Sequence, residues 1–156
     1  MLLAIKNVLF TLVVPGTVAF YLPVWIGGGR DAVPRFGAWQ GLAVPLLIAG
    51  AAIILWTVYD FATAGQGTPL PLDPPRRLVV RGLYRHMRNP MYTGVLAMNL
   101  GWALLFESLA VLAYGVAVWA IQAAFVLLYE EPKLGRLFGA EYDDYRRRVP
   151  RWIPRT

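Results

Sequence analysis

Four long apolar blocks, separated by short polar or charged segments, constrain what this chain can fold into. They cover residues 7–26, 39–61, 90–106 and 109–129. Their apolar residues are continuous rather than spaced as in an amphipathic helix, which is typical of membrane spans. With 58% hydrophobic and 15% charged residues, the chain also carries fewer charges than a soluble domain of 156 residues. The sequence therefore predicts an all-α integral membrane protein, with four transmembrane helices forming one domain over residues 1–156.

Basic residues indicate the orientation of these spans. Most of the 15 Lys and Arg residues lie in the loop between the second and third blocks and in the C-terminal tail. Four crossings place both segments and the N-terminus on one face, which the positive-inside rule makes cytoplasmic. We therefore expect a multi-pass protein of the inner or plasma membrane, with a basic cytoplasmic middle loop, a cytoplasmic C-terminal segment and both termini in the cytoplasm.

Charge and cysteine content narrow the expected partners. The formal net charge of +6 is better explained by membrane lipids than by nucleic acid, because the basic residues flank apolar spans. With no cysteine and one histidine, neither disulfides nor a Cys/His zinc site is expected, and we expect no metal. The first block lacks a clear small-residue cleavage site, so we interpret it as an uncleaved helix that tolerates Pro15 and Pro23.

Small residues and one polar pair predict how the last two helices pack. Small residues let membrane helices approach closely. They form one predicted seam on each helix: Gly94 and Gly101 on the third, and Ala113, Ala117, Ala120 and Ala124 on the fourth. Asn99 and Gln122 each lie about 10–14 Å from the cytoplasmic helix ends by helical rise. We expect these two side chains to share an interhelical hydrogen bond, with a substrate contact as the alternative.

The Asn89-Pro90 pair marks where a basic, proline-rich loop gives way to the third helix. Asn is a favoured N-cap because its side-chain oxygen accepts from free backbone N–H groups, and Pro fits the first helical position. The free N–H groups, the helix dipole and the flanking Arg85 and Arg88 converge there. This combination favours a carboxylate or a phosphate.

Glu130 and Glu131 are predicted to end the fourth helix at the same face. Acids are unfavourable at the negative end of a helix dipole, so a cationic group should compensate for them. Arginines of the loop or tail would account for one acid, and the other would recognise a cation or ribose hydroxyls. Because the two helices are antiparallel, the acids come to lie beside Asn89-Pro90. Such a site suits a zwitterionic, sugar-bearing ligand such as S-adenosylmethionine.

Two motifs carry a resemblance to a known family. GLYRHMRNPMYTG at 82–94 and YEEPKLGRLFGAEYDDYRRRVPRWIP at 129–154 resemble the integral-membrane methyltransferases typified by isoprenylcysteine carboxyl methyltransferase and phospholipid N-methyltransferases. The resemblance covers roughly residues 65–154. It implies S-adenosylmethionine bound between the last membrane helices and the C-terminal segment, and a lipophilic or membrane-embedded acceptor that enters from the lipid.

The resemblance also implies site residues by position. The catalytic candidates are Asn89, Tyr92 and Glu131. The implied cofactor-binding residues are Gly65, Gly67, Arg88, Asn89, Pro90, Tyr92, Gly94, Glu130, Glu131, Tyr142, Tyr145 and Arg151. The prenylcysteine enzymes of the family carry His where this chain has Asn89, so a titratable group is absent from that position. Arg148 and Arg151 would close over the cofactor or bind lipid headgroups.

Methyl transfer from a sulfonium is an in-line displacement, in which the protein mainly aligns the donor and the nucleophile and excludes water. A carboxylate or thiolate acceptor needs no base. An ammonium acceptor has to lose a proton first, and Glu131 and Tyr92 are candidates for accepting it.

Two other functions remain open at this point. A lipid double-bond reductase would share the helix layout and bind a nicotinamide nucleotide at a comparable face. Its phosphates would need further basic residues where Glu130 and Glu131 stand. A non-catalytic membrane scaffold would use the basic tail for lipid binding, but it gives the paired acids, the helix start and the tyrosines no role.

Overall fold

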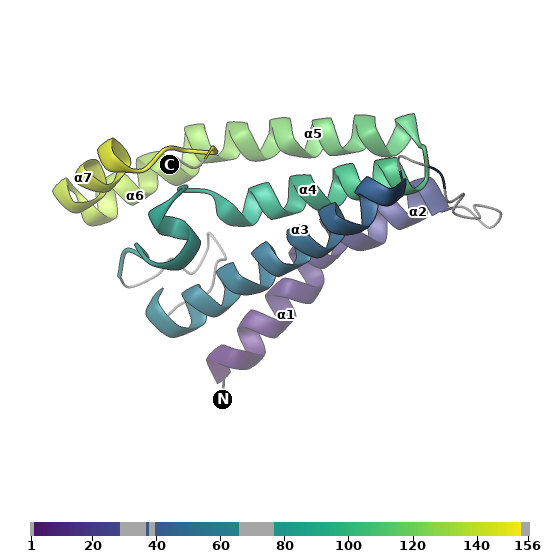
Figure 1. The fold of residues 1–156 in the computed structure, drawn as a ribbon. Helices are drawn as coiled ribbons and strands as arrows, with labels where there is room; N and C mark the ends of the chain where they lie inside the picture. Colours follow the sequence, from purple (N-terminus) through teal and green to yellow (C-terminus); the bar gives the residue numbers. More distant parts are fainter. Residues whose placement is uncertain (1, 29–36, 38–39, 66–76, 154–156) are drawn as a thin grey trace.

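Helices make up every element of this computed structural model, which describes residues 2–28, 37, 40–65 and 77–153. In chain order they are α1 (Leu2–Gly16), η1 (Thr17–Tyr21), α2 (Leu22–Gly28), α3 (Gln40–Asp60), η2 (Phe61–Gly65), η3 (Gly82–Arg85), α4 (Pro90–Leu105), α5 (Leu109–Phe125), η4 (Val126–Glu130), α6 (Glu131–Phe138) and α7 (Ala140–Arg148). Figure 1 shows α3, α4 and α5 running beside one another, with α6 and α7 beyond one end of α4. The predicted all-helical fold is confirmed for the described residues.

Among the described residues, three continuous helices are long and apolar enough to cross a membrane: Leu9–Gly28, Gln40–Thr63 and Leu109–Phe138. α4, the third predicted span, has 16 residues, or about 24 Å at helical rise. It is thus shorter than the other three, and it packs against both α3 and α5.

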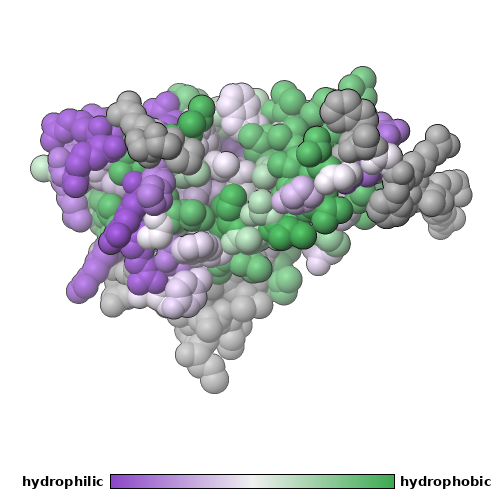
Figure 2. Space-filling view, viewed as in Figure 1, coloured by the Kyte–Doolittle hydropathy of each residue, from purple (hydrophilic) through white to green (hydrophobic). Residues whose placement is uncertain are grey.

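Large apolar side chains are exposed along the helices. Trp25, Leu109 and Leu128 have 77%, 80% and 80% of their surface exposed. In Figure 2, apolar residues cover much of the helical bundle, and polar residues gather over the end formed by α6 and α7. An apolar surface of this extent marks a region that contacts lipid or another apolar partner.

Pro23 shapes how the first helix joins the bundle. Proline has no N–H, so the carbonyl of Ala19 loses its usual helical partner, and the backbone widens into the π-helical turn η1. Trp102 of α4 donates to the Ala19 carbonyl at 2.9 Å, and Tyr114 of α5 donates to the Val18 carbonyl at 3.0 Å. Two backbone acceptors of the widened turn thus bind the first helix to α4 and α5.

Glycines bring the backbones of α3 and α4 together. A Cβ on Gly94 would stand 2.9 Å from the Gly50 carbonyl oxygen, and one on Gly101 would stand 3.1 Å from the Ala43 carbonyl oxygen. The predicted glycine seam is therefore confirmed, and its partner is α3. The predicted alanine seam on α5 is wrong, because all four of its alanines are exposed. α5 instead buries Val111 and Gly115.

The predicted hydrogen bond between Asn99 and Gln122 is also wrong. Asn99 Nδ2 donates to the Val95 carbonyl of its own helix at 2.9 Å. Asn99 faces Gly115, at whose position a Cβ would lie 3.0 Å from the Asn99 Cβ. Gln122 lies two turns further along α5. Asn99 Oδ1 and Gln122 Oε1 are both buried without a partner among the described residues.

The last membrane helix does not end at the acidic pair, contrary to the prediction. The π-helical turn η4 leads directly into α6, and the helix runs on to Phe138. Pro132 is tolerated because it lies in the first turn of α6, immediately after the widened turn. Glu130 and Glu131 therefore lie within a continuous helix, not at the negative end of a helix dipole.

Glycine substitutions test the contact between α3 and α4. We expect Gly94→Ala to lower the free energy of unfolding by about 1–3 kcal/mol, because its Cβ meets the backbone of Gly50. A lower apparent Tm of the detergent-purified protein would report this loss. Gly41→Ala is the matched control on α3, where a Cβ meets nothing within 4 Å. Equal melting temperatures for the two variants would contradict the close contact.

Candidate functional site

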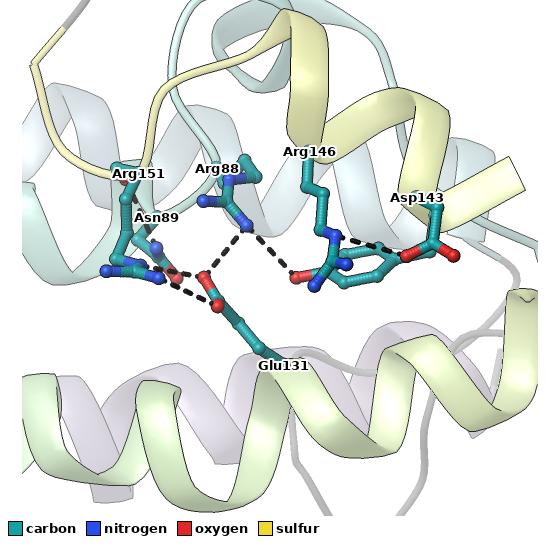
Figure 3. Close-up of polar contacts among 7 residues, drawn as sticks. Arg88, Asn89, Glu131, Asp143, Arg146 and Arg151 are labelled. Carbon is teal, nitrogen blue, oxygen red and sulfur yellow. Dashed lines mark hydrogen bonds and ion pairs between the residues drawn. The ribbon is translucent and has the colours of Figure 1, made fainter. Parts of the chain in front are cut away.

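Arg88, Glu131 and Arg151 come together from three separate segments. Glu131 Oε1 lies 2.8 Å from Arg88 Nη1. Arg151 donates to the same carboxylate through two nitrogens, from Nε to Oε1 at 2.8 Å and from Nη2 to Oε2 at 2.9 Å. Figure 3 shows Glu131 pointing from its helix toward both guanidinium groups. The helix start and the acidic pair therefore meet, as the sequence predicts.

Further contacts hold Arg88 in this position. Its backbone N–H donates to the Pro150 carbonyl at 2.9 Å. Its Nη1 donates to the Tyr142 hydroxyl at 3.3 Å. Its side chain is only 11% exposed, and its Nε is buried without a partner in the described part of the chain. Arg88 Nε is thus a buried donor that no described residue uses.

Asn89 lies at the N-cap of α4 and Pro90 at its first turn, as predicted. The predicted capping hydrogen bond of the Asn89 side chain does not form. Asn89 Nδ2 instead donates to the Arg151 carbonyl at 3.1 Å (Figure 3). The Asn89 carbonyl accepts from Thr93 N and from Thr93 Oγ1, both at 3.2 Å. The Asn89 side chain therefore links the start of α4 to the C-terminal segment by a hydrogen bond.

Glu130 faces a different partner from its neighbour. Tyr92 of α4 donates from its hydroxyl to Glu130 Oε2 at 3.0 Å. The two acids are thus divided: Glu131 is bound by two cations, and Glu130 by one neutral hydroxyl. We call the set Arg88, Asn89, Tyr92, Glu130, Glu131 and Arg151 the cup.

Charge is distributed unevenly between the two sides of the cup, one formed by Arg88, Glu131 and Arg151 and the other by Glu130. Arg88 and Arg151 share the single carboxylate of Glu131, which leaves one positive charge on this side. The hydrogen bond to Glu131 raises the pKa of Arg151, so its guanidinium stays protonated. The Arg88 side favours an anion, and Glu130 favours a cation or hydroxyl donors.

The C-terminal segment packs over the loop before α4 through buried tyrosines. Tyr142, Tyr145 and Val149 form a cluster, against which Leu78, Leu134 and Phe138 also pack. Tyr145 donates to the Tyr84 carbonyl at 2.7 Å. Burial raises the pKa of both Tyr142 and Tyr145, so both phenols remain protonated. This cluster positions Arg151 against Glu131.

A largely apolar cavity of about 360 Å³ adjoins the cup at Tyr92. Tyr92 and Gln122 supply its polar side chains. The other lining residues come from the first helix, α4 and α5: Phe10, Val14, Pro15, Val18, Met91, Val95, Val118, Ile121 and Phe125. The cavity can hold an apolar molecule with one end at the cup.

The remaining predicted site residues lie elsewhere. Gly94 packs against Gly50 of α3. This close contact is by itself a physical reason for a glycine at position 94, independent of any cofactor binding. Gly65 is the last residue of η2, and Gly67 falls outside the described residues. Arg148 is exposed and pairs with Asp144 on α7. In the described part of the chain, no group of three or more His, Asp or Glu residues has an arrangement that would hold a metal ion.

Sequence reasoning missed the contribution of the first helix. Phe10 and Val14 line the cavity beside α4 and α5, but their apolar side chains look like any other membrane-facing residues. Gln122 lines the cavity as well, so the substrate contact that the sequence left as the alternative to a helix contact stays a prediction for this residue.

Comparison with known proteins shows which family this chain resembles. Residues 39–141 match the family described as phospholipid methyltransferase. The chain is 37% identical to protein-S-isoprenylcysteine O-methyltransferase B of Arabidopsis thaliana over 50% of this chain and 40% of that protein. It is 32% identical to the corresponding protein of Schizosaccharomyces pombe over 49% and 33%. It is 29% identical to methanethiol S-methyltransferase of Crocosphaera subtropica over 62% and 34%. The chain thus spans less than half the length of these relatives.

Removing the Tyr145 hydroxyl tests the hydrogen bond from Tyr145 to the Tyr84 carbonyl, which joins the C-terminal segment to the loop before α4. We expect Tyr145→Phe to cost about 1–3 kcal/mol of stability, because the buried Tyr84 carbonyl loses its donor. Limited proteolysis should then cleave the segment after α7 faster than in the wild type. Tyr59→Phe is the control, since this ring is 63% exposed. Equal cleavage rates in both variants would show that this hydrogen bond does not hold the C-terminal segment in place.

Proposed function

Since the chain belongs to the phospholipid methyltransferase family, we propose that it transfers a methyl group from S-adenosylmethionine to a lipophilic or membrane-embedded acceptor. The observation that carries this proposal is the cup: an excess guanidinium and an acid held by a single hydroxyl meet beside an apolar cavity. The names of the relatives support methyl transfer.

The cup fits the amino-acid part of S-adenosylmethionine. The unused Arg88 Nε is a buried donor suited to a carboxylate. Arg151 lies across Glu131 from Arg88 and would contribute the second guanidinium. Glu130 would receive the ammonium group or ribose hydroxyls, because one neutral hydroxyl does not balance its charge. Tyr142 would orient Arg88 through its hydroxyl.

S-adenosylmethionine supplies an electrophilic methyl group when it is bound. The residues of the chain would contribute alignment and exclusion of water. Asn89 would hold the C-terminal segment over the helix start. A carboxylate or thiolate acceptor needs no base. For an ammonium acceptor, Glu130 together with Tyr92 is better placed to take the proton than Glu131, both of whose oxygens accept from guanidinium groups.

The cavity favours a lipophilic acceptor. Its wall is formed by apolar side chains of the first helix and α5, both long and apolar enough to cross a membrane, and of α4. An acceptor chain in this cavity would reach the cup at Tyr92, which belongs to both. A prenylcysteine carboxylate, an amine headgroup and a hydrophobic thiol all satisfy this geometry.

We also propose that α4 is the fourth crossing. Its 16 residues suffice if the bilayer thins slightly or if residues flanking the helix extend the span. Four crossings place α6 and α7 on the same face as the basic loop, which the positive-inside rule makes cytoplasmic. The cup then lies at the cytoplasmic surface.

Ligand binding tests the proposed function. The purified protein should bind S-adenosylmethionine, and it should bind the decarboxylated analogue roughly tenfold more weakly, because the carboxylate pairs with Arg88 and Arg151. Glu131→Gln should weaken S-adenosylmethionine binding and methyl transfer by a similar factor, because Arg88 and Arg151 lose the carboxylate that positions them. Calorimetry and transfer of a labelled methyl group to a lipid extract would measure these effects.

Glu141→Gln, on the exposed surface of α7, is the matched control and should behave as the wild type. Melting curves of both variants would separate a site defect from unfolding. Binding of NADPH in place of S-adenosylmethionine would support the reductase alternative. Equal affinity for the donor and its decarboxylated analogue would refute the assigned carboxylate site.

A further inference from the structure

Gln122 is one of two residues with polar side chains that line the apolar cavity. Gln122 lines the cavity, and its Oε1 is buried with no hydrogen-bond partner in the described ranges. The other polar side chain of the lining, Tyr92, already donates its hydroxyl to Glu130. The remaining lining residues are apolar.

This arrangement costs free energy, because a buried acceptor without a donor loses its hydration and gains nothing in return. A helix contact does not explain it. Asn99, the polar residue of the neighbouring helix, donates to its own backbone and packs against Gly115. An unpaired side-chain oxygen in a membrane helix points to a ligand where its residue also lines a cavity, as Gln122 does and Asn99 does not.

We propose that Gln122 selects lipophilic acceptors that carry an N–H or O–H donor within the cavity. This inference rests on the proposed function and narrows its substrate class. Gln122 lies eight residues before Glu130, or about 12 Å along the helix. An acceptor whose buried part is plain hydrocarbon leaves the Gln122 carbonyl unpaired and binds more weakly. An acceptor with a hydroxyl, amine or amide donor at that depth satisfies it.

Two probes with the same dodecyl chain separate these cases. 1-Dodecanol has a hydrogen-bond donor, and 1-methoxydodecane has an oxygen but no donor. Native mass spectrometry of the purified full chain would count the bound probe without any methyl donor present. We expect the wild type to prefer the alcohol by roughly five- to tenfold, as for one hydrogen bond in a desolvated site. Gln122→Leu should abolish this preference while still binding both probes.

Asn99→Leu is the matched control, because it also removes an unpaired buried amide oxygen but does not line the cavity. It should keep the preference for the alcohol. The inference is overturned if the wild type binds both probes equally, if it binds neither, or if Gln122→Leu keeps the preference. Since the measurement omits S-adenosylmethionine, its outcome is independent of whether the methyl donor binds.

Discussion

The carboxylate of Glu131, shared between Arg88 and Arg151, is the interaction on which the arrangement of the cup depends. One arginine precedes α4, and the other follows α7, so a single acid joins the helix start to the C-terminal segment. Breaking such a partly buried contact leaves like charges facing each other, which is more costly than losing an exposed ion pair. The tyrosine cluster and the Asn89 amide reinforce the same junction. The cup is therefore held by segments far apart in the sequence.

Behind the cup, the bundle combines close and loose packing. α3 and α4 approach through glycines until their backbones touch. The first helix is held by side-chain hydrogen bonds to the carbonyls near Pro23, and it leaves a cavity further along, where Phe10 and Val14 form one wall. A tight pair of helices thus fixes the polar groups, while a more loosely held helix leaves room for an apolar molecule.

Sequence reasoning predicted the helices and the meeting of Asn89-Pro90 with the acids, because apolar block lengths and antiparallel order determine both. It also predicted that arginines of the loop or tail would pair with one acid, which Glu131 confirms, but it predicted other side-chain partners wrongly. The alanines of α5 are exposed because α5 turns Val111 and Gly115 inward. The spacing of small residues along a helix does not specify which face of that helix packs against its neighbours. The Asn99–Gln122 pairing assumed equal depths from the helix ends, whereas the helix runs on past Glu131. The role of the tail arises from contacts between residues more than fifty positions apart, such as Asn89 and Arg151.

The uninterrupted helix through Pro132 fixes the distance between the cup and the start of α5. From Leu109 to Glu131 the helix rises about 33 Å, close to the hydrocarbon thickness of a bilayer. In the proposed membrane arrangement, the charged residues stand at the level of the headgroups, and the membrane as well as the protein sets their depth. A thicker bilayer would draw them toward hydrocarbon, and a thinner one would lift them into water. In that arrangement, the thickness of the bilayer sets the depth at which the cup lies.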